Sequence, residues 1–95
     1  MNIYEVIKRP LETEKAYALR KFRQYAFVVN QRANKLQIRR AVEDIYGVKV
    51  ESVNVMVMPA KINKMQGRRR VVRRPAWKKA VVTLAPGQHI EELEA

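Results

Sequence analysis

The sequence predicts one α+β domain, residues 1–95, in which helices pack against a small, mainly antiparallel sheet and a long basic hairpin loop joins the last two strands. Three observations predict this class. Apolar residues alternate within 23–30, they recur at helical spacing within 35–46, and two further strand-like runs flank residues 59–75. The length allows one core and leaves no room for a second domain.

The first elements are short. The apolar residues of 3–9 form an element that Pro10 ends, because proline lacks the donor that would continue it. Thr13 then fits the N-cap of a short helix that runs to about Arg20. Residues 23–30 place alternate aromatic and branched side chains on one face, which predicts a strand.

The segment 35–46 predicts the longest helix. Asn34 followed by Gln37 matches a capping box, and Gly47 supplies a left-handed end. Its apolar stripe consists of Ile38, Ala41, Val42 and Ile45.

Two strands follow, separated by the loop. Valines change parity after Val50, which predicts a bulge or bend near Glu51 and Ser52. Residues 76–84 form the last strand, and residues 90–95 are expected to form an acidic tail. The loop at 59–75 far exceeds the usual length of a hairpin connection, and loops that long are usually functional or disordered.

The charge distribution indicates a polyanion as partner. The formal net charge is +11, and no acidic residue occurs from Ser52 to Ile90. A loop with charge of one sign repels itself unless an external anion neutralises it, so we favour phosphate binding over a merely solvated loop. The expected phosphate contacts are Lys61, Lys64, Arg68, Arg69, Arg70, Arg73, Arg74, Lys78 and Lys79.

Further candidates lie outside the loop. Trp77 either packs at the strand edge or stacks on an unpaired base or ribose, and both roles can hold together. A second patch of RNA contacts is predicted at Arg9, Lys15, Lys35 and Arg39.

Catalysis, cofactors and metals are not indicated. The chain has no cysteine, no glycine-rich phosphate loop and no metal-ligand cluster, and its one histidine, His89, has no partner suggested by spacing. We therefore expect no enzyme, no cofactor and no metal site. The apolar runs are too short for membrane insertion and the N-terminus lacks a signal layout, so we expect a soluble intracellular protein.

Three blocks of sequence resemble a known family. The strings IKRPLETEKA, ANKLQIRRAVEDIYGVKVESVNV and RRPAWKKAVVTLAPGQ are similar, in this order, to large-subunit ribosomal proteins of the L-twenty-three family, over about Tyr4 to Gln88. The resemblance implies a small α+β domain that binds large-subunit rRNA beside neighbouring ribosomal proteins, at the exit of the nascent-peptide tunnel. It also implies that the hairpin extends into the rRNA, where its tip can reach the nascent chain. The protein would be ribosome-bound, in the cytoplasm or in an organelle of bacterial descent.

The same resemblance implies a protein-docking site. Thr13 and Glu14 fall on the family's motif that contacts a ribosome-associated chaperone, close to where the signal recognition particle and the protein-conducting channel dock. Glu14 would also favour the helix dipole without any partner. Two other functions stay open: a free-standing RNA- or DNA-binding or nucleic-acid chaperone module, and a small phosphate-ester enzyme.

Overall fold

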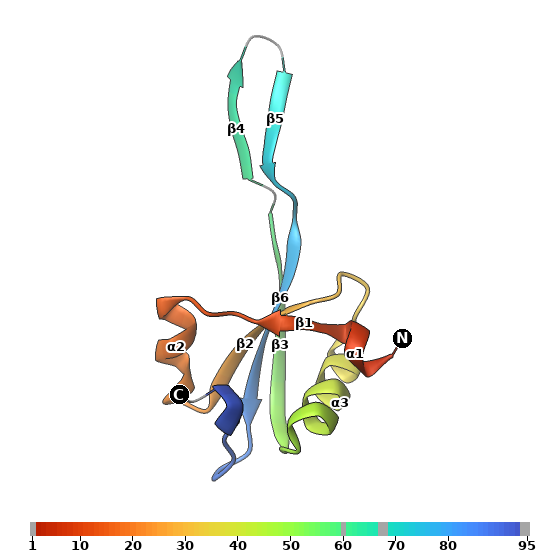
Figure 1. Ribbon diagram of the computed structural model, residues 1–95, viewed down its shortest axis with the longest axis vertical. Coiled ribbons are helices and arrows are strands. Elements are labelled where there is room, and N and C mark those ends of the chain that lie inside the picture. Colours follow the sequence, from red (N-terminus) through yellow and green to blue (C-terminus); the bar gives the residue numbers. More distant parts are fainter. Residues whose placement is uncertain (1, 60, 67–68, 94–95) are drawn as a thin grey trace.

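The computed structural model describes residues 2–59, 61–66 and 69–93 (Figure 1). Helices and strands alternate in the N-terminal half, and strands dominate the C-terminal half. The elements are α1 (Ile3–Val6), β1 (Ile7–Pro10), α2 (Glu14–Arg20), β2 (Gln24–Val29), α3 (Lys35–Tyr46), β3 (Val50–Met58), β4 (Lys61–Gln66), β5 (Arg69–Arg74), β6 (Trp77–Leu84) and a 3₁₀ turn (Glu91–Leu93).

Four strands form one antiparallel sheet in the order β1-β2-β6-β3. β2 and β6 lie at its centre although residues 30–76 separate them in the chain. β4 and β5 form a second sheet of their own. The predicted α+β class is therefore confirmed.

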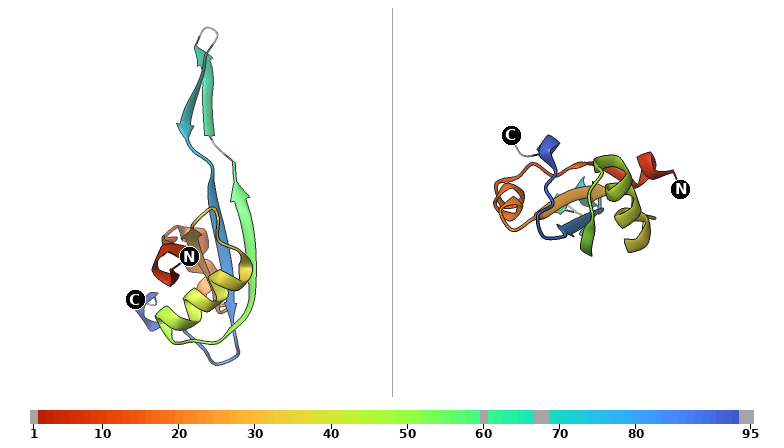
Figure 2. Two further views of the ribbon diagram at one scale, coloured as in Figure 1. Left: turned by 90° about the vertical axis from the view of Figure 1, so that its right-hand side faces the viewer. Right: turned by 90° about the horizontal axis from the view of Figure 1, so that it is seen from below.

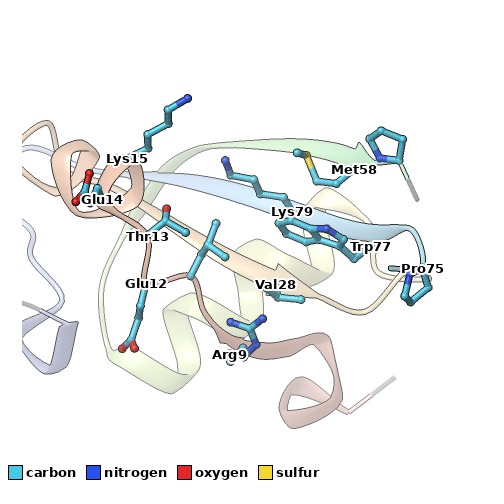
Figure 3. Close-up of a pocket in the computed structure, with 12 residues that line it drawn as sticks. Arg9, Glu12, Thr13, Glu14, Lys15, Val28, Met58, Pro75, Trp77 and Lys79 are labelled. Atoms are coloured by element: carbon cyan, nitrogen blue, oxygen red, sulfur yellow. The ribbon is translucent and has the colours of Figure 1, made fainter. Parts of the chain in front are cut away.

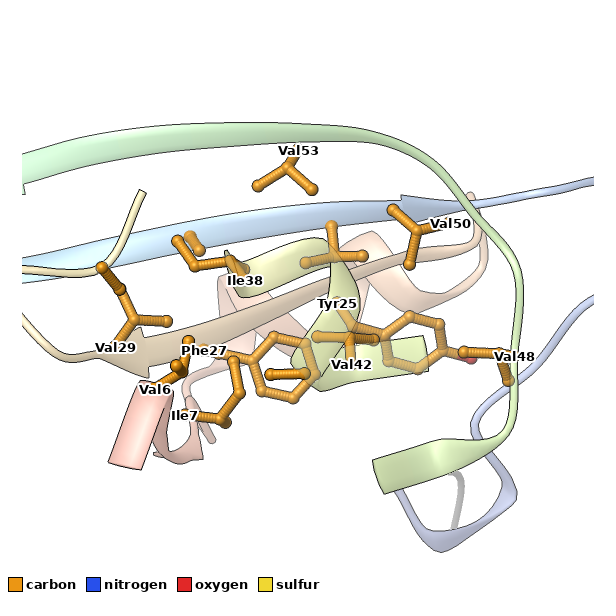
Figure 4. Packing of buried hydrophobic residues seen from close by; sticks show 14 of the residues in the cluster. Val6, Ile7, Tyr25, Phe27, Val29, Ile38, Val42, Val48, Val50 and Val53 are labelled. Carbon is orange, nitrogen blue, oxygen red and sulfur yellow. The ribbon is translucent and has the colours of Figure 1, made fainter. Parts of the chain in front are cut away.

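One face of the four-stranded sheet carries the main core, which α1 and α3 cover (Figure 4). Tyr25 and Phe27 of β2 are fully buried there, together with Ile38 of α3 and Val82 of β6. The Phe27 ring also lies 5.8 Å from the Tyr46 ring, centroid to centroid. The alternation predicted for this strand is confirmed, because its large side chains all enter this core.

The structure confirms the local features predicted in and around α3. Asn34 and Gln37 form both hydrogen bonds of a capping box, and Gly47 ends the helix with φ of 65°. The pairing of β3 with β6 shifts register between Val50 and Ser52, which confirms the predicted irregularity. This shift turns Val53 toward the same core as Val50.

The opposite face of the sheet is covered only in part. Ala16 and Leu19 of α2 pack against Ala26 of β2 and Val81 of β6. This second, smaller core occupies one end of the face. The end nearest β4 and β5 carries no helix among the described residues (Figure 1).

The C-terminal segment belongs to the fold. Ile90, the first residue of the expected acidic tail, is fully buried in the main core, and its N–H donates to the Tyr25 hydroxyl at 3.3 Å. The Arg20 guanidinium donates to the carbonyl of Leu93 and lies 4.2 Å from the Tyr17 ring centroid. The chain therefore returns to the domain after the turn at Pro86 and Gly87.

The expected long loop is largely a two-stranded hairpin. β3 and β6 lead out of the domain, and β4 and β5 continue the projection (Figures 1 and 2). The radius of gyration is 15.3 Å, whereas a compact chain of this length is expected near 12 Å. The longest dimension of 54 Å runs along the hairpin.

Candidate nucleic-acid interface

The pleat of β6 separates two neighbouring lysines. Lys79 lies opposite Val28 of β2 and Met56 of β3, on the face that α2 covers in part. Lys78 lies on the other face, toward the loop before α3. Trp77, two residues before Lys79, shares its face and pairs with Met58.

A groove lies on the uncovered end of this face, between the start of α2 and the base of the hairpin (Figure 3). Its volume is about 1210 Å³, which is ample for a nucleotide or a short peptide segment. It is lined by Arg9, Leu11, Glu12, Thr13, Glu14, Lys15, Val28, Met58, Pro59, Pro75, Trp77 and Lys79.

The groove brings together residues that the sequence assigned to two different partners. Arg9, Lys15, Trp77 and Lys79 were predicted to bind RNA, whereas Thr13 and Glu14 were predicted to dock a protein. Strand pairing explains the meeting of Arg9 and Lys79: both flank Val28, one from β1 and one from β6.

Three cations of the groove are uncommitted. Within residues 2–59 and 75–93, the side chains of Arg9, Lys15 and Lys79 have no hydrogen bond or ion pair. An uncommitted cation at the surface can neutralise a phosphate without first breaking a contact inside the protein. Glu12 and Glu14 lie at the α2 end, so the negative charge is concentrated away from Trp77 (Figure 3).

Lys78 has a different environment. Its ammonium donates to the carbonyl of Ala33 at 2.7 Å and to that of Gln31 at 3.3 Å. The lysine thus fastens the loop between β2 and α3 to the sheet. Lys35 and Arg39 are exposed on α3, which covers the opposite face from the groove, and the Arg39 Nε lies 3.9 Å from a Glu43 oxygen. These three predicted contacts are not part of the groove.

The basic residues of the hairpin lie on its two strands. Backbone pairing places Lys61 opposite Arg74 at the base and Arg69 opposite Gln66 near the tip. Arg68 lies outside the described residues. The remaining predicted contacts of this region, Lys64, Arg70 and Arg73, follow the same two strands.

The docking residues occupy the start of α2. The Thr13 hydroxyl accepts from the Ala16 N–H at 3.2 Å, which confirms the predicted N-cap. Glu14 is exposed in the first turn. Its carboxylate is therefore accessible to a partner.

Sequence reasoning missed the apolar members of the groove. Leu11, Val28, Met58, Pro59 and Pro75 carry no charge signal and come from four separate segments. Parity along 23–30 did place Val28 on the face opposite Phe27. The partner strand that brings Lys79 beside it could not be deduced from that parity.

Other sites are not indicated in the part of the chain that the structure describes. There, no three acidic or histidine side chains gather as metal ligands, and His89 lies exposed near the turn at Gly87, away from the groove. None of the described helices is long and apolar enough to cross a bilayer.

Comparison with known proteins identifies the family. The family model described as ribosomal protein L23 matches residues 5–92. A large ribosomal subunit protein uL23 of Thermotoga neapolitana is 48% identical, with 99% of this chain and 92% of the relative aligned. The uL23 proteins of Myxococcus xanthus and Desulfovibrio desulfuricans are 47% and 48% identical, over 99% of this chain and 96% and 98% of theirs. The chain therefore belongs to the ribosomal protein L23 family, and it is a ribosomal structural protein and not an enzyme.

Proposed function

We propose that this protein is a component of the large ribosomal subunit that binds large-subunit rRNA through its hairpin and through the groove at the base of the hairpin. In this role it is ribosome-bound in the cytoplasm. The family relationship supports the assembly, since the relatives are named as large-subunit proteins. The charge of the hairpin in the sequence and the groove in the structure support the choice of RNA-binding surfaces.

The observation that carries the proposal is a basic hairpin that projects alone. Among the described strands, β4 and β5 pair only with each other, and a two-stranded hairpin without further packing is marginally stable in water. The acid-free span from Ser52 to Ile90 contains the whole hairpin, so its positive charge lacks internal compensation along the chain. A polyanion that surrounds the hairpin would supply both packing and counter-charge.

The resemblance implies that this contact lies at the exit of the nascent-peptide tunnel, and we include that location in the proposal. The exposed Glu14 would then contribute to docking of a ribosome-associated chaperone, the signal recognition particle and the protein-conducting channel. The hairpin tip would approach the nascent chain. Neighbouring ribosomal proteins would cover other parts of the surface.

The second candidate is a free-standing nucleic-acid-binding or chaperone module, which the same basic hairpin would suit. Sedimentation of a cell lysate through sucrose separates the two functions. The proposed function requires the protein to travel with the large subunit. Co-sedimentation with chromosomal DNA or messenger RNA instead would support the alternative.

A charge reversal tests the hairpin as the main anchor. Arg73→Glu together with Arg74→Glu should reduce the amount of protein on purified large subunits, because the two carboxylates would repel rRNA phosphates. The matched control is Arg40→Glu with Lys49→Glu, which changes net charge equally at two exposed positions outside the predicted contacts. Equal occupancy of the two double variants would refute the hairpin as anchor.

A further inference from the structure

We propose that the end of the groove nearest the hairpin holds one unpaired RNA nucleotide, whose base stacks on Trp77 and whose flanking phosphates contact Arg9 and Lys79. The inference rests on the proposed function, because the nucleotide would belong to the bound rRNA. Base stacking would let the surface recognise unpaired bases, whereas its charge alone would bind any phosphate backbone.

The aromatic part of the site is built by strand pairing. Trp77 opens β6 and pairs with Met58 of β3, at the base of the hairpin (Figure 3). Pro59, which follows Met58, and Pro75, two residues before Trp77, line the same groove. The indole is half-buried, so the sheet holds it while part of its surface stays open. A flat ring fixed in this way offers a stacking surface to any base.

The charged part of the site begins at Lys79, two residues after Trp77 on β6. Arg9 and Lys79 flank Val28 from opposite sides, which separates their strands by about 10 Å, or two interstrand spacings. Both side chains are long and have no partner within residues 2–59 and 75–93. They can therefore turn toward phosphates on either side of a base that covers Val28 and Trp77.

The arrangement favours an unpaired nucleotide over a duplex. In an A-form helix the base faces are stacked on one another and closed to a protein ring, so Trp77 could meet only the backbone. At the other end of the groove, the carboxylates of Glu12 and Glu14 outnumber the single cation of Lys15, so this end would repel phosphates. This repulsion confines the RNA to the end formed by Trp77, Arg9 and Lys79.

Trp77 is the only tryptophan of the chain, so its fluorescence reports on the site directly. We would titrate the whole protein with a short oligoadenylate and with an RNA duplex, following binding by anisotropy of the labelled RNA. The single strand should quench Trp77, whereas the duplex should bind through the hairpin without quenching it. Trp77→Ala should weaken binding of the oligoadenylate about 5- to 150-fold, the range found for loss of one stacked base.

Two controls make the test decisive. Trp77→Phe keeps a flat ring and should retain most of the affinity, and thermal unfolding followed by circular dichroism checks that each variant is folded. Duplex affinity should be the same in all three proteins. Equal quenching by duplex and single strand, or an unchanged affinity of a folded Trp77→Ala protein, would overturn the proposal and leave a protein as the better occupant of the groove. Because the subunit-occupancy test of Arg73 and Arg74 does not involve the groove, that function can stand when the stacking inference fails.

Discussion

Lys78 and Lys79 offer a matched pair of substitutions, since they are adjacent in sequence and lie on opposite faces of one strand. Methionine at either position keeps most of the apolar stem and removes the charge. Lys78→Met loses the hydrogen bonds from the ammonium to the carbonyls of Ala33 and Gln31, at 2.7 and 3.3 Å. Because Ala33 is buried, water would not readily replace the lost donor at its carbonyl.

The expected magnitudes differ between the two variants. A hydrogen bond to a charged group contributes about 1.5–3 kcal/mol, and partial exposure of the lysine lowers that value, so Lys78→Met should reduce the free energy of unfolding by about 1–2 kcal/mol. Lys79→Met should change it by less than about 0.5 kcal/mol, because no hydrogen bond or ion pair is lost within residues 2–59 and 75–93 and methionine keeps the apolar stem. For RNA binding the order reverses: Lys79→Met should lower the slope of log K against log salt by about 0.7–0.9, the effect of one phosphate contact.

Urea unfolding and RNA titrations at several salt concentrations measure both quantities for each variant. The reasoning predicts that Lys78→Met changes stability and leaves the salt slope unaltered, while Lys79→Met does the opposite. If both lysines changed the salt slope equally, the separation of the two faces would have no bearing on binding. If both left stability unchanged, the loop before α3 would not depend on the Lys78 ammonium.

Two further predictions concern the C-terminal segment and α2. Ile90→Ala should lower the free energy of unfolding, measured in urea, by about 2–4 kcal/mol and Ile90→Val by about 1 kcal/mol, because Ile90 is fully buried. Losses near zero for both variants would mean that Ile90 belongs to a tail and not to the core. Glu14→Gln should weaken binding of a ribosome-associated chaperone to purified ribosomes carrying the variant, with subunit occupancy unchanged, whereas Glu5→Gln, an exposed carboxylate on α1, should have no such effect. Equal chaperone binding to ribosomes carrying either variant would argue that Glu14 only favours the helix dipole.

The elements that the sequence predicted well depend on local signals. The capping box at Asn34 and Gln37, the left-handed Gly47 and the parity change after Val50 each specify backbone geometry within a few residues. Such signals survive any tertiary arrangement. They were sufficient for the longest helix, for strands β2, β3 and β6, and for the irregularity in β3.

These local signals could not predict which distant segments of the chain pair with one another. The predicted contacts at Lys78 and Lys79 were grouped because both are basic, although the period of two residues along β6 already separates them. Ile90 was assigned to a tail because acidic residues follow it. Its spacing of three from Leu93, which also packs against the core, was the available sign of a folded segment.

The groove itself needed the sheet order. Residues 9–15 meet residues 75–79 because β2 stands between β1 and β6, and no local pattern specifies that order. The hairpin, by contrast, was evident from charge and spacing before its strands were known. Its length was predicted, and its paired strands were not.

The sheet gives the two predicted partners separate places on one surface. The main core occupies the face under α1 and α3, so the opposite face is the one that can expose Trp77 and Lys79 without losing that core. At one end of the groove, Thr13 is committed to capping α2 and Glu14 stays exposed. At the other end, Trp77, Arg9 and Lys79 lie next to the base of the hairpin. RNA bound at the hairpin end would fix the domain while the acidic end repels phosphate, and this repulsion would keep Glu14 accessible to protein factors.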